Sequence, residues 1–368
     1  MIIGIPREIK DNEYRVGMIP AGAADLTASG HTVLVEKEAG TGVEIPDRAF
    51  KEKGAETGVT APEIYSRSDM IVKVKEPRLS EIELFQEELI IASFLHLAPE
   101  PEITAALLAK RVTGIAYETL REKDGTFPVL KPMSCIAGKA SVQIGAGLLL
   151  RHHGGRGVLL GGVPGVSGGT VVIVGAGTVG SNALKIAVGM GAKVVILDID
   201  TRKLERLEKI YGSRIETRYV DKLAGAVREA DLLIGAVLVP GGLAPKVITR
   251  DMVKGMKPGS VIIDVAVDQG GCCETTRTTC HSSPTFVEEG VVHYGVSNIP
   301  GIVPVTSTHA LAHASIKYIR KIADLGVPAV FLESEAVASG VNLYQGKVTC
   351  ERVAQTLNLE YSSVTSIV

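Results

Sequence analysis

The chain contains no tryptophan among its 368 residues, and aromatic residues make up only 4% of it. So few aromatic rings leave little surface for stacking on unpaired bases, which is a common way to bind single-stranded nucleic acid. An excess of basic residues is also absent, because 39 lysines and arginines face 41 aspartates and glutamates and give a net charge of −2. Binding to a phosphate backbone or to an anionic membrane is therefore not expected.

Cysteine is scarce, and none of the five cysteines lies in a CxxC pair. Cys272, Cys273, Cys280 and His281 are close in sequence, but structural zinc sites usually place about two to four residues between paired ligands. We expect reduced thiols and no resident metal. The first residues, "MIIGIPREIK", reach charged side chains at once, unlike a signal peptide. These features predict a cytoplasmic protein.

One long stretch, residues 157–184, carries no charge at all. It is rich in glycine and contains Pro164, so a continuous membrane helix is excluded. We expect a loop, a strand, a turn and a helix start in this order. With 45% hydrophobic and 22% charged residues, the chain is typical of a globular protein, and its length predicts two domains.

Short apolar strands alternate with amphipathic helices along most of the chain. Near-continuous apolar strands of this kind indicate parallel sheets that are covered on both faces. We expect an α/β fold with two Rossmann-like domains joined by long helices and an active-site cleft between them. The expected strands are 2–5, 32–36, 70–74, 89–95, 112–117, 171–174, 193–197, 232–237, 261–266 and 291–296; the expected helices include 21–30, 61–68, 135–153, 307–326 and 349–359, and residues 123–134 are expected to form turns.

The segment "TVVIVGAGTVGSNALKIAVGMGAKVVILDID" carries the most specific motif. An apolar strand leads into Gly175-x-Gly177-x-x-Gly180, a helix follows, and a second strand ends at Asp198. This order matches the dinucleotide-binding fingerprint, in which the three glycines allow a tight turn, a close approach to the pyrophosphate and close packing of the helix. The helix N-terminus favours the pyrophosphate. An acid such as Asp198 binds the ribose hydroxyls and repels a 2′-phosphate, which favours NAD over NADP.

Polar side chains follow several expected strands at their carboxyl ends, where open α/β sheets bind ligands. Arg15 lies after the first strand, Lys75 follows the strand at 70–74, and His96 follows the strand at 89–95. In the second half, Asp268 and Asn298 occupy the same kind of position. We expect these groups to meet at one substrate cleft between the two domains.

Each of these residues also has a structural interpretation. Arg15 could be a solvated loop charge, Lys75 could extend from a strand end, His96 could be a core histidine, and Asp268 could cap a loop or helix. Their common position at strand ends favours chemistry instead. Histidine suits proton transfer because its ordinary pKa is about 6.5, and a cationic pair suits a small anionic substrate. If the substrate is an amine, water attacks an iminium, and Asp268 would serve as a second proton acceptor.

Across nearly the whole chain the sequence resembles the alanine dehydrogenase family. The resemblance rests on the segments "GIPREIKDNEYRVGMIP", "VKVKEP", "LHLAPE", "KPMS", "GGVPGV", "VGAGTVGSNALKIAVGMGA", "GAVLVPGGLAPKVI", "MKPGSVIIDVAVDQGGC" and "IPGIVPVTST". It implies reversible, NAD-dependent oxidative deamination of L-alanine to pyruvate and ammonium. On this basis Arg15 and Lys75 bind the substrate, and His96 and Asp268 are the acid/base groups.

The same resemblance implies the cofactor contacts, the domain boundaries and the assembly. Relatives usually form hexamers, and their first domain is completed by the C-terminal segment, which here gives residues 1–128 with 307–368 as the substrate domain and 129–306 as the NAD-binding domain. The cofactor positions that it implies, together with the motif glycines Gly175, Gly177 and Gly180, are Ser134, Thr178, Asp198, Lys203, Val237, Leu238, Val265, Ala266, Val267, Asp268, Arg277, Val296, Ser297, Asn298 and Ile299.

The chain departs from the usual family pattern at a few positions. Phe94 stands where many relatives have tyrosine, which bears on substrate choice, and Val220 stands where a small polar residue is common near the adenosine.

Three other functions share parts of this pattern. They are the soluble NAD-binding part of proton-translocating transhydrogenase, the dehydrogenase that forms lysine from saccharopine, and a nucleotide sensor without catalysis.

Overall fold

The computed structural model describes residues 1–237 and 242–367, which divide into two compact units. Unit 1 comprises residues 1–133 and 301–367, together with Gly242, and unit 2 comprises residues 134–237 and 243–300. Each unit contains one β-sheet. None of the helices in these ranges combines the length and the apolar character needed to cross a membrane.

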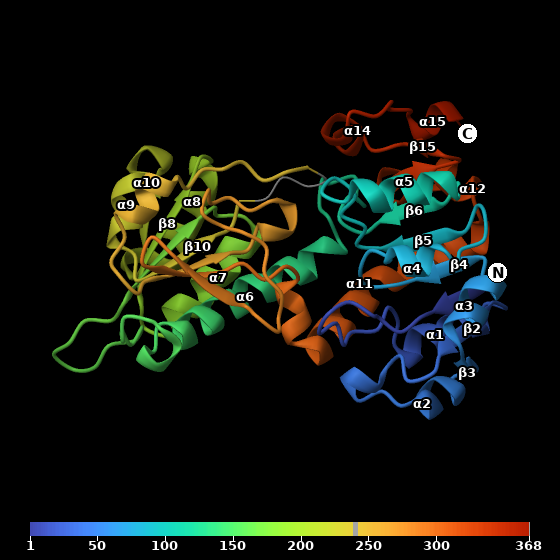
Figure 1. Ribbon diagram of the computed structural model, residues 1–368, viewed down its shortest axis with the longest axis horizontal. Coiled ribbons are helices and arrows are strands. Elements are labelled where there is room, and N and C mark those ends of the chain that lie inside the picture. The colour runs from blue at the N-terminus through green and yellow to red at the C-terminus, as the bar shows by residue number, and fades with distance from the viewer. Residues whose placement is uncertain (238–241, 368) are drawn as a thin grey trace. The chain divides into compact units, whose positions relative to one another are not determined.

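Unit 1 is built on an eight-stranded sheet in the order β15-β14-β6-β5-β4-β1-β2-β3. Six strands are parallel, whereas β14 and β15 run antiparallel to their neighbours. In Figure 1, β15 near the C-terminus lies in the same sheet as β6 from the first third of the chain. The strands are β1 (Ile2–Ile5), β2 (Thr32–Glu36), β3 (Glu56–Val59), β4 (Met70–Val72), β5 (Ile90–Ser93), β6 (Thr113–Ala116), β14 (Val341–Tyr344) and β15 (Lys347–Val348).

The helices of unit 1 come from both ends of the chain. They are α1 (Pro20–Ala28), α2 (Asp47–Lys51), α3 (Ala61–Arg67), α4 (Leu79–Ile82), α5 (Pro101–Ala109), α11 (Pro304–Leu325), α12 (Ala329–Glu333), α13 (Glu335–Gly340), α14 (Glu351–Leu357) and α15 (Val364–Ile367). The longest of them, α11, packs against α1. Proline opens α1, α5 and α11, where its missing N–H removes no helical hydrogen bond.

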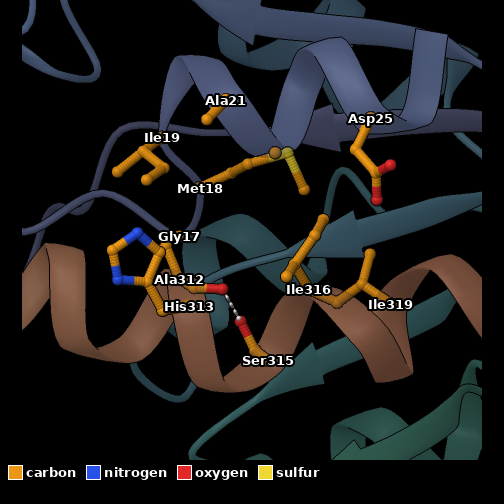
Figure 2. Close-up of a pocket in the computed structure, with 11 residues that line it drawn as sticks. Gly17, Met18, Ile19, Ala21, Asp25, Ala312, His313, Ser315, Ile316 and Ile319 are labelled. Atoms are coloured by element: carbon orange, nitrogen blue, oxygen red, sulfur yellow. Dashed lines mark hydrogen bonds between the residues drawn. The ribbon is translucent and has the colours of Figure 1, made fainter. Parts of the chain in front are cut away.

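A cavity of about 170 Å³ lies between α1 and α11. Figure 2 shows Ala21 and Asp25 of α1 above it, and His313 and Ile316 of α11 on its other side. Its remaining lining residues are Gly17, Met18, Ile19, Gly22, Ala312, Ser315 and Ile319. None of the predicted substrate or cofactor residues is among them, so this cavity is not the candidate site.

Unit 2 is built on a seven-stranded sheet in the order β12-β13-β11-β10-β7-β8-β9, in which only β12 is antiparallel. Its strands are β7 (Thr170–Val174), β8 (Lys193–Asp198), β9 (Glu216–Tyr219), β10 (Leu232–Gly235), β11 (Val261–Asp264), β12 (Thr285–Glu288) and β13 (Val291–Tyr294). Its helices are α6 (Leu130–Leu148), whose first residues belong to unit 1, α7 (Thr178–Gly189), α8 (Thr201–Tyr211), α9 (Leu223–Glu229) and α10 (Arg250–Lys254).

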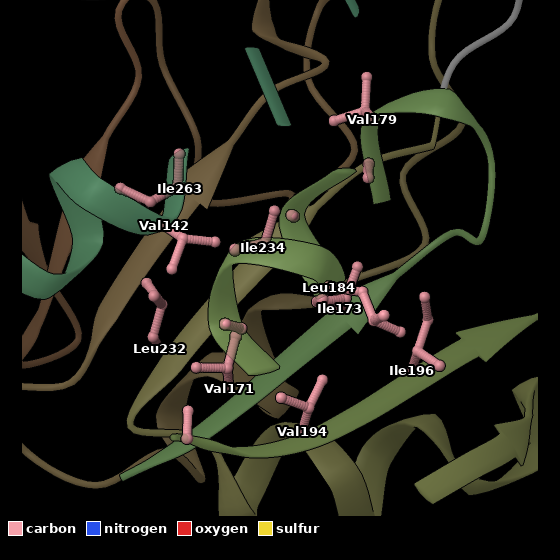
Figure 3. Close-up of a cluster of buried hydrophobic side chains, with 14 of the residues drawn as sticks. Val142, Val171, Ile173, Val179, Leu184, Val194, Ile196, Leu232, Ile234 and Ile263 are labelled. Carbon is pink, nitrogen blue, oxygen red and sulfur yellow. The ribbon is translucent and has the colours of Figure 1, made fainter. Parts of the chain in front are cut away.

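The central strand β7 shows why the sheet of unit 2 is covered on both faces. Val171 and Ile173 belong to one buried cluster, and Val172 belongs to another. Successive side chains of a strand point to opposite faces, so an all-apolar strand requires cover on both. Figure 3 shows the first cluster, where Val142 of α6 and Leu184 of α7 lie among the side chains of β7, β8 and β10.

The predicted α/β fold class with two mostly parallel sheets is confirmed. Two local predictions were wrong. The expected turn at 123–134 instead contains the start of α6, which begins at Leu130 and accepts Pro132 in its first turn. The strands at 70–74 and 89–95 end sooner, at Val72 and Ser93.

Candidate functional site

The glycine motif of unit 2 forms the turn between β7 and α7. Gly175 has φ +106°, and a Cβ there would lie 2.6 Å from the carbonyl oxygen of Ala236. A Cβ on Gly180 would lie 1.8 Å from the carbonyl oxygen of Gly175. Gly177 differs, because its φ is an ordinary −73° and a Cβ there would have no described atom within 4 Å. The fold therefore requires glycine at 175 and 180, but its own packing does not require glycine at 177.

Asp198 ends β8 and is tied to this turn. Its Oδ2 accepts a hydrogen bond of 2.6 Å from the backbone N–H of Ala176, and its Oδ1 accepts one of 2.8 Å from Asp200. The ammonium of Lys203 lies 3.5 Å from Oδ2. Thr178 is the first residue of α7, so the free N–H groups of a helix N-terminus follow the glycine turn to which Asp198 is bonded. The arrangement fits the phosphates and the ribose of a dinucleotide.

The loops after β11 and β13 bring Asp268 and Asn298 together. Asp268 lies in a short 3-10 helix, Val267–Gln269, and both of its carboxylate oxygens accept from the backbone N–H of Asn298, at 3.1 and 3.2 Å. Asn298 has φ +73°, a conformation that asparagine adopts more readily than most residues. Asp268 is thus held at the carboxyl edge of the sheet, as expected from the sequence.

The other predicted cofactor positions also belong to unit 2. Ser134 is buried in α6, and the guanidinium of Arg277 lies 4.3 Å from the centre of the Phe286 ring. The positions Val237, Val265, Ala266, Val267, Val296, Ser297 and Ile299 follow β10, β11 and β13. Leu238 lies outside the described residues. Val220 begins a 3-10 turn after β9.

Arg15 lies in unit 1 and is 2% exposed, so its interpretation as a solvated loop charge is wrong. Glu13 binds its guanidinium at two points, with Nε to Oε1 at 2.7 Å and an Nη to Oε2 at 2.6 Å. A third contact reaches the sulfur of Met133 at 3.5 Å. Bidentate binding of this kind fixes the plane of the guanidinium and orients it for a carboxylate.

Two lysines follow β4 and have different surroundings. Lys73 is fully buried; burial by itself lowers its pKa, but the carboxylates of Glu8 and Glu81, at 3.2 and 2.7 Å, raise the pKa above the usual value. Lys75 is also buried, and its ammonium lies 3.3 Å from Oε2 of Glu76. Lys73 therefore belongs to a structural ion cluster. Lys75 instead pairs with Glu76, a carboxylate that also lies near His96.

His96 lies three residues beyond β5 and has φ +44°, an unusual conformation for histidine. The carboxylate of Glu118, which follows β6, accepts from the backbone N–H groups of His96 and Leu95 at 2.7 and 3.3 Å. Similarly, Glu8 accepts from Val74 N at 2.6 Å. These carboxylates take N–H groups that a longer strand would use for pairing, which explains why β4 and β5 end early.

The imidazole of His96 is mostly buried, with 16% of its side chain exposed. Its Nδ1 lies 4.0 Å from Oε2 of Glu76. The ring of Phe94 stacks on it at 5.8 Å between centres, and Tyr117 meets Phe94 edge-on at 5.5 Å. The structure thus brings Lys75 and His96 together around Glu76, which sequence reasoning had missed.

Sequence reasoning missed the carboxylates that contact Arg15, Lys75 and His96. Glu8 and Glu13 lie in "GIPREIKDNEYRVGMIP", Glu76 lies in "VKVKEP", and Glu118 is the second residue after β6. The rule that selected Lys75 and His96, a polar residue just after a buried strand, also selects Glu76 and Glu118. Nothing in the sequence assigns a hydrogen-bond partner to each.

The cysteine cluster is part of the buried structure of unit 2. Cys272 and Cys273 are fully buried, Cys280 is exposed, and the Asp264 carboxylate accepts a 3.0 Å hydrogen bond from Cys273 N. Burial raises the pKa of the Cys272 thiol, and Asp264 raises it further. In the part of the chain that the structure describes, no three histidine, cysteine, aspartate or glutamate side chains gather as metal ligands.

Comparison with known proteins covers nearly the whole chain. Family models for the N-terminal and C-terminal domains of alanine dehydrogenase/PNT match residues 4–137 and 141–351. The chain belongs to the alanine dehydrogenase/PNT family. An alanine dehydrogenase of Methanococcus maripaludis is 52% identical over 98% of each chain. The family resemblance seen in the sequence is thus confirmed.

Two solved structures of this family's fold extend the comparison. A structure named L-alanine dehydrogenase is 47% identical, covers 97% of this chain and 99% of its own, and gives a TM-score of 0.90. A transhydrogenase from Sinorhizobium meliloti is 24% identical, covers 95% of this chain and 99% of its own, and gives a TM-score of 0.78. The second likeness shows a shared fold and nothing about activity.

Proposed function

We propose that the protein catalyses the reversible, NAD-dependent oxidative deamination of L-alanine to pyruvate and ammonium. The observation that carries the proposal is the pairing of the Lys75 ammonium and the His96 imidazole around the Glu76 carboxylate, with Arg15 oriented by Glu13 in the same unit. A cationic pair and a proton-transfer group are what an amino acid substrate requires. The relatives' names support alanine as that amino acid.

The cofactor is NAD in this proposal, and the residues of unit 2 fit it. The open space at Gly177 and the free N–H groups of α7 suit the pyrophosphate, and Asp198 with Lys203 suits the ribose. The nicotinamide, when bound, would supply the acceptor for the hydride that leaves the α-carbon of alanine. We assign the other contacts to Ser134, Thr178, Val237, Leu238, Val265, Ala266, Val267, Asp268, Arg277, Val296, Ser297, Asn298 and Ile299.

The residues of the chain bind the substrate and move its protons. Arg15 binds the alanine carboxylate, and Lys75 holds the substrate by a second charged contact. His96 is the general acid/base, and Asp268 is the second acid/base group, needed when water adds to the imino carbon. Alanine, NAD⁺ and water give pyruvate, ammonium, NADH and one proton, which His96 and Asp268 pass on.

The family resemblance carries three further proposals. Residues 1–128 with 307–368 form the substrate domain and 129–306 the NAD-binding domain. The protein assembles as a homohexamer. It works in the cytoplasm, in amino-acid catabolism, with small molecules as its only ligands.

The test is NADH formation, followed by absorbance, with a panel of L-amino acids and with NAD or NADP at alkaline pH. Reduction of NAD by L-alanine, reversed by pyruvate and ammonium, is the expected result. His96→Ala should reduce turnover far more than NAD binding, and equal activity in that variant would contradict the role of His96. Hydride exchange between nucleotides without alanine would favour the transhydrogenase function, activity with saccharopine would favour the lysine-forming enzyme, and NAD binding without any reduction would favour a sensor.

A further inference from the structure

The carboxylate of Glu76 is a buried anion that faces three groups of unit 1. Its Oε1 accepts a hydrogen bond from the Lys10 ammonium. Its Oε2 lies 3.3 Å from Lys75 Nζ and 4.0 Å from His96 Nδ1. Only 5% of the side chain is exposed, so little water screens these interactions. One oxygen is therefore engaged, and the other lies between the ammonium and the imidazole.

The two facing atoms of Glu76 and His96 are both buried and both lack a hydrogen bond among the described residues. Buried polar atoms are usually hydrogen-bonded, because an unpaired one has lost its water without gaining a partner. Nδ1 can donate and Oε2 can accept, so a small side-chain rotation that shortens the 4.0 Å separation satisfies both. The backbone of His96 stays in place during this rotation, because Glu118 holds its N–H at 2.7 Å.

We propose that Glu76 is the positioning residue of His96: it accepts the Nδ1–H, fixes the tautomer and leaves Nε2 to exchange the proton with the substrate. This inference rests on the proposed function. When Nε2 takes a proton in deamination, the imidazole becomes an imidazolium, and the Glu76 carboxylate stabilises it. In the reverse direction Nε2 returns that proton. Glu76 remains ionised throughout and takes no proton itself.

The charges around the pair are consistent with this role. Burial by itself raises the pKa of Glu76, but Lys75, Lys10 and His96 lower it to about 2. The carboxylate is therefore ionised at neutral pH. Among the described residues, the charged groups in contact with this part of unit 1 include Lys75 and Lys10 at Glu76, Glu8 at the backbone of Lys75, and Glu118 at the backbone of His96.

The experiment compares Glu76→Gln with Glu81→Gln in the full chain. Both replace a buried, lysine-paired carboxylate by a neutral amide of similar size, but Glu81 contacts Lys73 and Tyr65 and not His96. For Glu76→Gln we expect kcat with L-alanine to fall about ten- to a hundred-fold, and the acid limb of the kcat profile to move down by about one pH unit or more, because removal of an anion lowers the pKa of an imidazole. NAD affinity should stay within about twofold. In Glu81→Gln the acid limb should not move.

A rise in the KM for alanine with an unmoved pH profile would overturn the proposal, because Glu76 would then act through Lys75 alone. If Glu76→Gln does not fold, Glu76→Asp keeps the charge but withdraws it from Nδ1, and should lower kcat without losing the acid limb; wild-type kinetics there would also refute the role. NMR titration of the His96 ring, assigned with His96→Asn, needs no turnover. The pKa of the ring should fall in Glu76→Gln even if alanine proves not to be the substrate, and an unchanged pKa would refute the role of Glu76. Failure of the positioning role can thus be told apart from failure of the proposed function.

Discussion

Replacing Gly177 by alanine should remove most NAD binding while unit 2 stays folded. The reason is the contrast within the glycine motif. A Cβ at Gly177 would meet no described atom within 4 Å, whereas a Cβ at Gly180 would lie 1.8 Å from the carbonyl oxygen of Gly175. Gly180→Ala is therefore the matched control, because the same methyl group is added three residues away, where the fold itself cannot accept it.

The expected magnitudes follow from these surroundings. A methyl group at Gly177 keeps a phosphate from the first N–H groups of α7, and the loss of one or two charge-assisted hydrogen bonds amounts to about 2–4 kcal/mol. The Kd for NAD should rise about 30- to 1,000-fold. Stability should change by no more than about 1 kcal/mol, because alanine lowers the entropy of the unfolded chain but is a poorer helix N-cap than glycine. Gly180→Ala should lose about 1–3 kcal/mol or more.

Calorimetric titration with NAD and thermal unfolding without NAD measure the two effects separately. Gly177→Ala should unfold at nearly the wild-type temperature and bind NAD weakly. Gly180→Ala should unfold at a clearly lower temperature before any ligand is added. If Gly177→Ala bound NAD as tightly as the wild type, the open side of this turn would not be where the pyrophosphate binds, and the assignment of the motif would be wrong.

Three more perturbations test the surroundings of the site. Glu118→Gln places an amide donor against one of the two backbone N–H groups that the carboxylate now accepts. Unfolding in urea should therefore show a loss of about 1–3 kcal/mol, and kcat should fall at unchanged NAD affinity. A wild-type kcat would show that the backbone of His96 needs no such acceptor. Burial alone raises the pKa of Glu76, but its lysine neighbours lower it from 4.5 to about 2. The ionised carboxylate therefore stabilises the folded state by about 3 kcal/mol. This stabilisation is present above the pKa of the unfolded state and is lost as the pH falls toward the pKa of the folded state. Glu76→Gln should accordingly lose less unfolding free energy than the wild type on acidification, and parallel curves would argue against an ionised Glu76. Asp198→Ala removes the carboxylate that repels a 2′-phosphate, so the ratio of the Kd values for NADP and NAD should fall about tenfold or more, and an unchanged ratio would place selectivity elsewhere.

Local patterns predicted the parts of the fold that depend on neighbouring residues. The strand, glycine turn and helix of the dinucleotide motif were found because each is set within a few residues of Gly175. Strands with near-continuous apolar side chains, such as β7, were found for the same reason. By contrast, β9 was not predicted. It has the sequence "ETRY" and lies at a sheet edge, where a strand needs little apolar character.

The partners of the site residues could not be predicted because they come from distant parts of the chain. Glu118 holds the backbone of His96 across 22 positions, and Glu8 accepts from Val74 across 66. These contacts depend on which strands become neighbours in the sheet. Sequence reasoning placed Lys75 and His96 at strand ends, and the same rule also selects Glu76. It had no basis for placing the Glu76 carboxylate between the other two side chains.

The place of β14 in the first sheet has a consequence for how the protein matures on the ribosome. β14 pairs with β6, yet residues 117–340 separate the two strands. All parts of unit 2 are synthesised before β14, so unit 2 can fold while the sheet of unit 1 still has an open edge at β6. The second residue after β6 is Glu118, which accepts the backbone N–H of His96. Until translation delivers β14, the sheet of unit 1 keeps an unpaired edge at β6, and such an edge favours aggregation and chaperone binding.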